Sequence, residues 1–204
     1  MVTIIKDVDL SKEIEKYDLL IVTTNTYCSM FNGFEREVAL DYPYVLDANL
    51  ATKYADPNKM GTIIECSKDN EPTFILAFIC RGYPKIKTKG ELPDFLSYES
   101  LEKCLKLINV RYKGRTIACP MIGCSRFDGN GNKEKVLEII NNTLTDVDVV
   151  IYDYFQEKRA EKRLRTIKEE LEVKKKDYAA YYDMVKKRKE KADERFRKNG
   201  HARY

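Results

Sequence analysis

The sequence predicts an α/β fold, a three-layer sandwich around a mixed, mostly parallel sheet, followed by a long C-terminal helix. Apolar β-branched runs alternate with segments of helical periodicity, which is the pattern of such a sandwich. One run, Asp18–Thr24 (DLLIVTT), is apolar almost throughout, as in strands that are buried on both faces. The chain has neither proline nor glycine from Phe155 to about Lys198, which predicts the helix.

The first part of the chain is predicted to hold strands and a short helix. Val2–Ile5 is a β-branched run. Phe34–Ala39 predicts a helix that ends at Tyr42-Pro43, because a residue before proline is held out of the α region. Asp56-Pro57-Asn58 has the composition of a turn. Two adjacent strands are then predicted, at Gly61–Cys66 and Pro72–Cys80.

The same alternation continues after a basic loop at Lys85–Pro93. Ser97 opens a helix in which Leu101, Leu105 and Ile108 recur at helical spacing. The remaining elements are a strand at Arg115–Cys119, a glycine-rich loop at Gly123–Gly131, a helix marked by Val136, Ile139, Ile140 and Leu144, and a strand at Asp148–Tyr152.

Composition excludes several classes of protein. The chain has 204 residues, of which 43% are hydrophobic, enough for a core without disulfide or metal staples. Its apolar runs fall far short of the roughly 20 residues that a membrane-spanning helix needs. No signal peptide is readable, so we expect a cytoplasmic protein whose six cysteines are reduced and buried; for a phage protein this is the host cytoplasm. With one histidine and no CxxC pair, we expect no metal site, and nothing indicates a cofactor.

Charge divides the chain into two parts that we predict to be separate units. Residues 1–154 carry 19 Lys and Arg against 23 Asp and Glu, whereas residues 155–204 carry 18 against 10. The second part is thus a basic helix, in which apolar residues recur every seven positions. We expect this imperfect coiled coil to join copies of the chain through residues 155–198, with nucleic acid as an alternative partner of its positive charge. The apolar positions are Leu164, Leu171, Tyr178, Val185 and Ala192.

Five segments of residues 1–154 follow one another in the order and spacing of motifs from one known family. They are Asp18–Asn25 (DLLIVTTN), Gly33 nine residues before Tyr42-Pro43, Lys59-Met60-Gly61, Cys119–Cys124 (CPMIGC) and Val147–Tyr154. These segments resemble the macro domain family, a module of α/β fold that binds ADP-ribose, and in particular its divergent members from phages and bacteria. The resemblance implies a macro-like sandwich over residues 1–154.

The resemblance also implies where a ligand binds. Asn25 would contact the distal ribose, the loops Met30–Gly33 and Cys124–Gly129 would clasp the diphosphate, and Asp9 or Asp7 would accept the adenine amino group. Both loops follow strands, and ligands of such sheets bind at the carboxyl ends of strands. Glycines let backbone N–H groups approach phosphates there. The site residues implied are Asp9, Asn25, Met30, Phe31, Asn32, Gly33, Gly123, Cys124, Ser125, Arg126, Phe127 and Gly129.

These residues also have structural interpretations, which stay open at this point. Asn25 is suited to cap the turn after its strand, and the glycines are suited to turns with positive φ. Phe31 and Phe127 would either anchor their loops on the core or stack on a base or ribose. Asp128, next to a glycine, is a common turn residue.

Several positions depart from the family pattern. Phe31 replaces the first glycine of the MGxG motif, Glu35 replaces the small residue after its second glycine, and Ser125 replaces a glycine of the second loop. Some relatives that remove ADP-ribose use a Lys at the end of the middle strand with an Asp in the second loop. Here Arg81 stands at that strand end, and a guanidinium stays protonated and cannot attack as an amine.

Two classes of function follow from these observations. In the first, the protein binds ADP-ribose or a related nucleotide or NAD-derived metabolite, and any hydrolase activity is weak and depends on Asp128, which is displaced by one residue from the family spacing. In the second, a degenerate macro fold binds no nucleotide, and the protein acts as an assembly, protein-interaction or nucleic-acid-contacting module. The lost glycines favour the second class, and the retained Asn25 and loop spacing favour the first.

Overall fold

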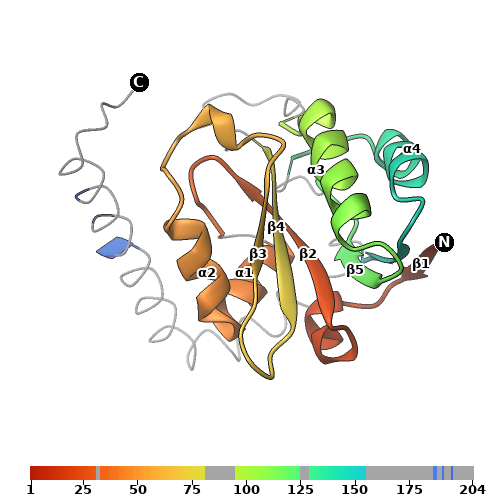
Figure 1. The fold of residues 1–204 in the computed structure, drawn as a ribbon, viewed down its shortest axis with the longest axis horizontal. Helices are drawn as coiled ribbons and strands as arrows, with labels where there is room; N and C mark the ends of the chain where they lie inside the picture. The colour runs from red at the N-terminus through yellow and green to blue at the C-terminus, as the bar shows by residue number, and fades with distance from the viewer. Residues whose placement is uncertain are drawn as a thin grey trace, which may run out of the picture. The chain divides into compact units, whose positions relative to one another are not determined.

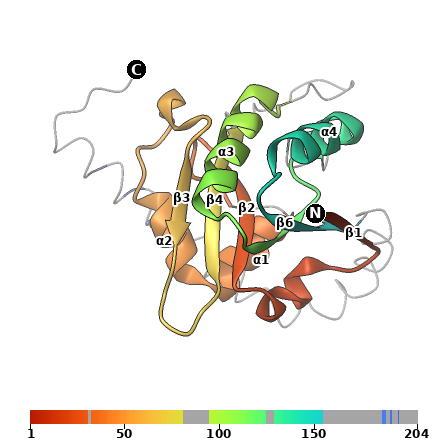
Figure 2. The same cartoon turned by 45° about the vertical axis from the view of Figure 1, so that its right-hand side comes forward.

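Six strands form one sheet in the described part of a computed structural model, which covers residues 1–30, 33–80, 95–124 and 129–154 and four isolated positions near the C-terminus. Their order across the sheet is β1-β6-β5-β2-β4-β3. Figure 1 shows β3, β4, β2 and β5 in succession, and Figure 2 labels β6 and β1. Their bounds are β1 Val2–Lys6, β2 Leu19–Asn25, β3 Ile63–Cys66, β4 Thr73–Cys80, β5 Thr116–Pro120 and β6 Asp148–Asp153.

The sheet is mixed and mostly parallel, as the sequence predicts. Each neighbouring pair from β1 to β4 is parallel, and only β3 runs antiparallel, against β4. All seven residues of β2 are buried, as are residues 74–80 of β4. These central strands are covered on both faces, which explains why their sequences are apolar without alternation.

Helices cover both faces of the sheet and complete the three layers (Figures 1 and 2). On one face, residues of α3 and α4 form a core with Leu19 and Ile21 of β2. On the other face, the Phe74 ring of β4 lies 4.8 Å from the Tyr42 ring. The helices are α1 Gly33–Asp41, α2 Pro43–Leu50, α3 Tyr98–Arg111 and α4 Lys133–Thr143.

The helix α2 was not predicted from the sequence. A helix was expected to end at Tyr42-Pro43, and α1 does end at Asp41, but Pro43 begins a second helix after a single residue. Proline suits the first helical position, because the N–H that it lacks would have no partner within the helix. Two short 3-10 turns, at Leu10–Lys12 and Ile14–Lys16, were not predicted either, whereas the 3-10 turn at Pro57–Lys59, capped by Asp56, confirms the turn predicted at Asp56-Pro57-Asn58.

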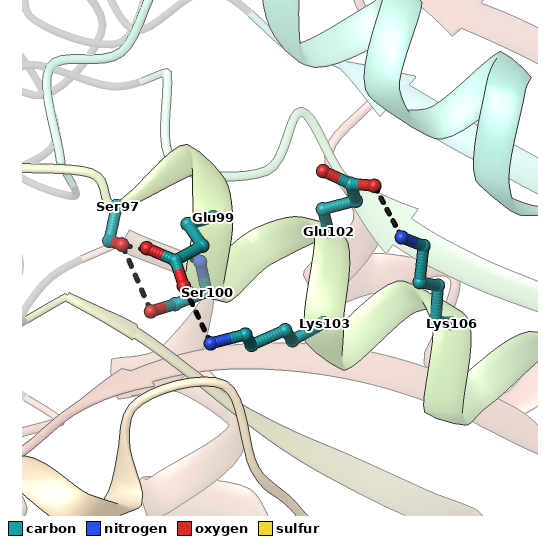
Figure 3. Close-up of polar contacts among 6 residues, drawn as sticks. All are labelled: Ser97, Glu99, Ser100, Glu102, Lys103 and Lys106. Carbon is teal, nitrogen blue, oxygen red and sulfur yellow. Dashed lines mark hydrogen bonds and ion pairs between the residues drawn. The ribbon is translucent and has the colours of Figure 1, made fainter.

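The helix α3 begins at the position that the sequence predicts. Ser97 caps it, because its Oγ accepts a hydrogen bond from the Ser100 N–H at 3.2 Å, and the two hydroxyl groups lie 2.9 Å apart (Figure 3). On the exposed face of the helix, Glu99 pairs with Lys103 and Glu102 with Lys106, each at 2.6 Å (Figure 3). The glutamate precedes the lysine in both pairs, the order that stabilises a helix.

The sheet belongs to a unit formed by Met1–Asn49 and Ala55–Tyr154. A second unit takes in Leu50–Tyr54 and Phe155–Tyr204. The long helix expected over residues 155–198 lies outside the described residues except at Lys186, Lys187, Glu190 and Glu194, which are helical and exposed. The loop expected at Lys85–Pro93 also lies outside them. Within the described ranges, no helix has the length and apolar character to cross a membrane.

Candidate functional site

The neighbouring strands β2 and β5 define the position of the candidate site. They are parallel, with Leu20 paired to Ala118. After β2 the chain continues toward β4 and β3, whereas after β5 it continues toward β6 on the other side. Right-handed connections in opposite directions place α1 and α4 on opposite faces. Ligands of such sheets bind at the carboxyl ends of the two strands where the direction changes.

The first loop starts at Asn25, whose side chain organises it. The Asn25 Oδ1 accepts hydrogen bonds from the N–H groups of Tyr27 at 3.0 Å and Ser29 at 3.3 Å, and its Nδ2 donates to the Ser29 carbonyl at 2.9 Å. The residue is only 1% exposed and lies at an irregularity in the pairing of β2 with β4. Asn25 thus caps its own turn, as one of the two interpretations expected, and its contact with a ribose stays a prediction.

The rest of this loop leads into α1. Met30 is fully buried and anchors the loop on the core. Gly33, with a φ of 53°, begins α1 in the left-handed region that favours glycine. Glu35 is buried in the first turn of this helix, where the helix dipole favours a negative charge. The predicted site residues Phe31 and Asn32 lie outside the described residues.

Three glycines surround Leu96 at the base of the second loop. A Cβ atom at Gly129 would lie 2.7 Å from the Gly123 carbonyl oxygen, and one at Gly123 or Gly131 would lie 2.9 or 2.5 Å from a methyl group of Leu96. The Gly129 carbonyl accepts hydrogen bonds from the N–H groups of Phe95 and Leu96, at 2.7 and 3.1 Å. At Gly129 the close atom is a backbone oxygen, which cannot move aside as a leucine methyl group can, and the φ of 117° also favours glycine, so the base of the loop depends on glycine there.

The structure describes the two ends of this loop and not its middle. Cys124, at one end, is half-buried, and its thiol donates to the Ile122 carbonyl at 3.2 Å. Ser125, Arg126, Phe127 and Asp128, which were predicted as site residues, lie outside the described residues, as does Arg81. Their roles at the site stay predictions.

Asp9 lies at the same edge of the sheet, beyond the carboxyl end of β1. Its Oδ1 accepts hydrogen bonds from the N–H and hydroxyl groups of Ser11, at 3.1 and 2.8 Å, which caps the first 3-10 turn. The other candidate, Asp7, has a φ of 60°, and its N–H donates to the Asp153 carbonyl at 3.1 Å. Because β1 and β6 are parallel neighbours, both aspartates are at the edge that carries the two loops.

Lys59 is a buried cation at this edge, which the sequence placed in the segment Lys59-Met60-Gly61 but not among the site residues. Its Nζ lies 3.1 Å from the Cys28 Sγ in the first loop and 4.9 Å from the centre of the Phe78 ring. Lys59 is 9% exposed, and this burial lowers the pKa of its ammonium group. The sequence assigns no role to its side chain, because only the antiparallel hairpin of β3 and β4 brings it to the carboxyl end of β4.

The cysteines mostly behave as small apolar residues. None of the six is in a disulfide bond, and five are buried. Burial raises the pKa of the Cys66, Cys104 and Cys119 thiols to about 12, so these three remain protonated thiols near neutral pH. Among the residues that the structure covers, no group of His, Cys, Asp and Glu side chains is suited to hold a metal ion.

Solved structures of other proteins share this fold. A protein of unknown function from Bacteroides thetaiotaomicron is similar, with a TM-score of 0.61 and 21% identity over 75% of this chain and 98% of that one. The macrodomain of Thermus aquaticus DarG is similar, with a TM-score of 0.53 and 17% identity over 75% of this chain and 98% of its own. A macrodomain protein from Streptomyces coelicolor has a TM-score of 0.54 and 17% identity, over 76% of this chain and 100% of its own.

No family model and no curated protein matches the sequence. The structural likenesses show a macrodomain fold for the sheet and its helices, which confirms the fold that the five sequence segments imply.

Proposed function

Given the macrodomain fold of its sheet and helices, we propose that this protein binds ADP-ribose or a related nucleotide that carries a diphosphate. One observation carries the proposal: two loops that contain glycine begin at the adjacent carboxyl ends of β2 and β5. A diphosphate between these loops would be bound by backbone N–H groups and by the positive end of α1, without a dedicated cation.

The ends of both loops support binding because they are already organised. Asn25 determines the turn of the first loop, and the close glycine packing around Leu96 determines the base of the second. A site that is formed before the ligand arrives loses less conformational entropy on binding. Asp9, held by Ser11 at the same edge, is the acceptor that we assign to the adenine amino group.

We propose binding and not efficient hydrolysis. The sequence has Arg81 where the related hydrolases have a nucleophilic lysine, and a guanidinium does not act as a nucleophile. Lys59 does not replace that lysine, because its Nζ is buried against Cys28 and Phe78 and a sugar carbon would have no access to it. A carboxylate such as Asp128 would support only slow turnover through a water molecule.

We further propose that residues 155–198 join copies of the chain. If these residues form a helix that does not pair with another copy, the apolar side chains at its heptad positions would be exposed to water. The alternative role of the chain, as an interaction module that binds no nucleotide, predicts the same association without affinity for ADP-ribose.

Calorimetric titration of the full chain with ADP-ribose tests the binding proposal. Asp9→Asn keeps an acceptor for the Ser11 cap but removes the charge, so we expect affinity to fall by about tenfold or more, because hydrogen bonds to charged groups contribute about 1.5–3 kcal/mol. Asp69→Asn is the matched control, since Asp69 is exposed in the β3–β4 turn at the opposite edge of the sheet. Absence of heat with the wild type at millimolar ADP-ribose would favour the interaction module.

A further inference from the structure

Cys28 and Lys59 form a contact that nucleotide binding does not require. The Lys59 Nζ lies 3.1 Å from the Cys28 Sγ, and the two residues are 31 positions apart in the chain. They are 5% and 9% exposed, so both reactive atoms are held in a largely water-free position. A thiol and an amine at this separation are close enough to react with one another if either becomes an electrophile.

Two features of the surroundings favour reaction at this pair. The Lys59 Nζ lies against the Cys28 sulfur, and the thiolate is the form of a cysteine that reacts with oxidants. Burial lowers the pKa of Lys59, which raises the fraction of neutral amine with a free lone pair. Neither residue is completely buried, and Tyr27, the residue before Cys28 in the chain, is 46% exposed. We expect hydrogen peroxide, which is nearly as small as water, to reach the sulfur through small local movements of this loop.

We propose that Cys28 and Lys59 form an oxidation site, at which a hydroperoxide joins the two side chains through an oxygen atom. The product is a covalent S–O–N link between the Sγ of Cys28 and the Nζ of Lys59. The two atoms are already in contact, so insertion of one oxygen between them needs less movement than a direct sulfur–nitrogen bond.

The reaction balances with hydroperoxide as the only oxidant. The Cys28 thiolate first attacks one hydrogen peroxide, which breaks the O–O bond and gives a sulfenic acid and one water. A second hydrogen peroxide then removes two electrons and two protons as the neutral amine of Lys59 forms a bond to the sulfenic oxygen, and it leaves as two waters. Overall, a thiol, an amine and two hydrogen peroxide molecules give the link and three waters. A thiol reductant reverses the reaction.

The link would have a structural consequence at the edge that carries the loops. Cys28 lies in the loop after β2, and Lys59 lies in the segment that enters β3. A covalent bond between them would fix the first loop to the adjacent hairpin. The proposal concerns these two side chains alone and does not depend on which ligand, if any, the loops bind.

Mass spectrometry of the oxidised full-length protein tests the proposal. The reduced protein is treated with hydrogen peroxide, quenched, and digested on the carboxyl side of glutamate, so that cleavage after Glu65 separates Lys59 from Cys66. We expect the peptides that contain Cys28 and Lys59 to be joined, with one oxygen gained and two hydrogens lost. Fragment ions should place the oxygen at the junction and not on Met30 or Met60. Dithiothreitol should separate the two peptides.

Matched variants make the result specific. Lys59→Arg keeps a cation and a donor but has no amine, so Cys28 should progress to sulfinic acid without a link. Cys28→Ser should also give no link, whereas Cys124→Ser should link like the wild type. Oxidation of Cys28 with Lys59 unmodified, a link without added oxygen, or an unreacted Cys28 when the other cysteines are oxidised would each overturn the proposal.

Discussion

The N–H of Gly131 donates a hydrogen bond of 2.9 Å to the carbonyl oxygen of Gly123, and this bond closes the base of the second loop. The same carbonyl oxygen faces Gly129, at which a Cβ atom would approach it to 2.7 Å. The conformation of the loop therefore depends on glycine at both ends. We propose that this loop, together with the one after β2, holds a diphosphate.

Gly129→Ala should destabilise the protein more than a positive φ alone explains. Gly129 has a φ of 117° and a backbone oxygen in contact, whereas Gly114 has a φ of 76° with nothing within 4 Å of its Cβ position. We predict that the free energy of unfolding falls by roughly 3 kcal/mol for Gly129→Ala and by about 1 kcal/mol for Gly114→Ala, measured by urea unfolding. Equal losses would show that the contact with the Gly123 carbonyl carries no energy.

Asn25→Ala should lower stability through the first loop. The substitution removes three hydrogen bonds to Tyr27 and Ser29 in a residue that is 1% exposed. We predict a loss of about 1–3 kcal/mol in the free energy of unfolding. Asn142→Ala, at an exposed position of α4, serves as the control and should be neutral or slightly stabilising. An Asn25→Ala protein of wild-type stability would argue that Asn25 is available for a ligand alone.

The sequence predicted the fold well because buried strands leave a strong local signal. Asp18–Thr24 and Pro72–Cys80 became β2 and β4, and Ser97 capped α3 as expected. The helix α2 was missed because Pro43 begins it. A proline that begins a helix and one that ends the preceding helix look the same in the sequence. The contact of Lys59 with Cys28 depends on the pairing of β3 with β4. The residues around a lysine do not predict such long-range pairing, so the sequence did not indicate this contact.

The site was only partly predictable for the same reason. Asn25 and the glycines could be located from their spacing, but spacing does not show whether the Asn25 amide faces a ligand or its own loop. Likewise, the need for glycine at position 129 comes from its contacts with Leu96 and with the Gly123 carbonyl oxygen. Leu96 is distant along the chain and Gly123 lies at the other end of the loop, so the local sequence does not show these contacts.

Lys59 should make stability depend on pH in a defined direction. Burial lowers the pKa of its ammonium group below the ordinary value of 10.5, so between the two values the unfolded state binds more protons than the native state. Stability conferred by this group therefore rises with pH. We predict that the free energy of unfolding increases as the pH rises toward 10.5, relative to that of Lys59→Met, in which this titration is absent. A difference that stays constant or falls over this range would contradict a desolvated ammonium.

The C-terminal segment should determine the oligomeric state. Leu171→Lys with Tyr178→Lys places two charges at apolar heptad positions, so we predict that an oligomer becomes a monomer in sedimentation velocity. Val173→Lys makes the same kind of change off the heptad seam and should leave the oligomer intact. A wild-type chain that sediments as a monomer at tens of micromolar would contradict self-association through residues 155–198.

The central claim is that a nucleotide diphosphate binds between the loops after β2 and β5, and amide chemical-shift mapping of the full chain with ADP-ribose tests it most directly. We predict saturable shifts at the N–H groups of Tyr27, Ser29, Gly33, Gly123 and Gly129, with smaller shifts at Ser11. The amides of Asp69 and Asn70, in the β3–β4 turn at the opposite edge, should not move. Saturable shifts confined to other parts of the sheet, or no shifts at millimolar ADP-ribose, would contradict the claim.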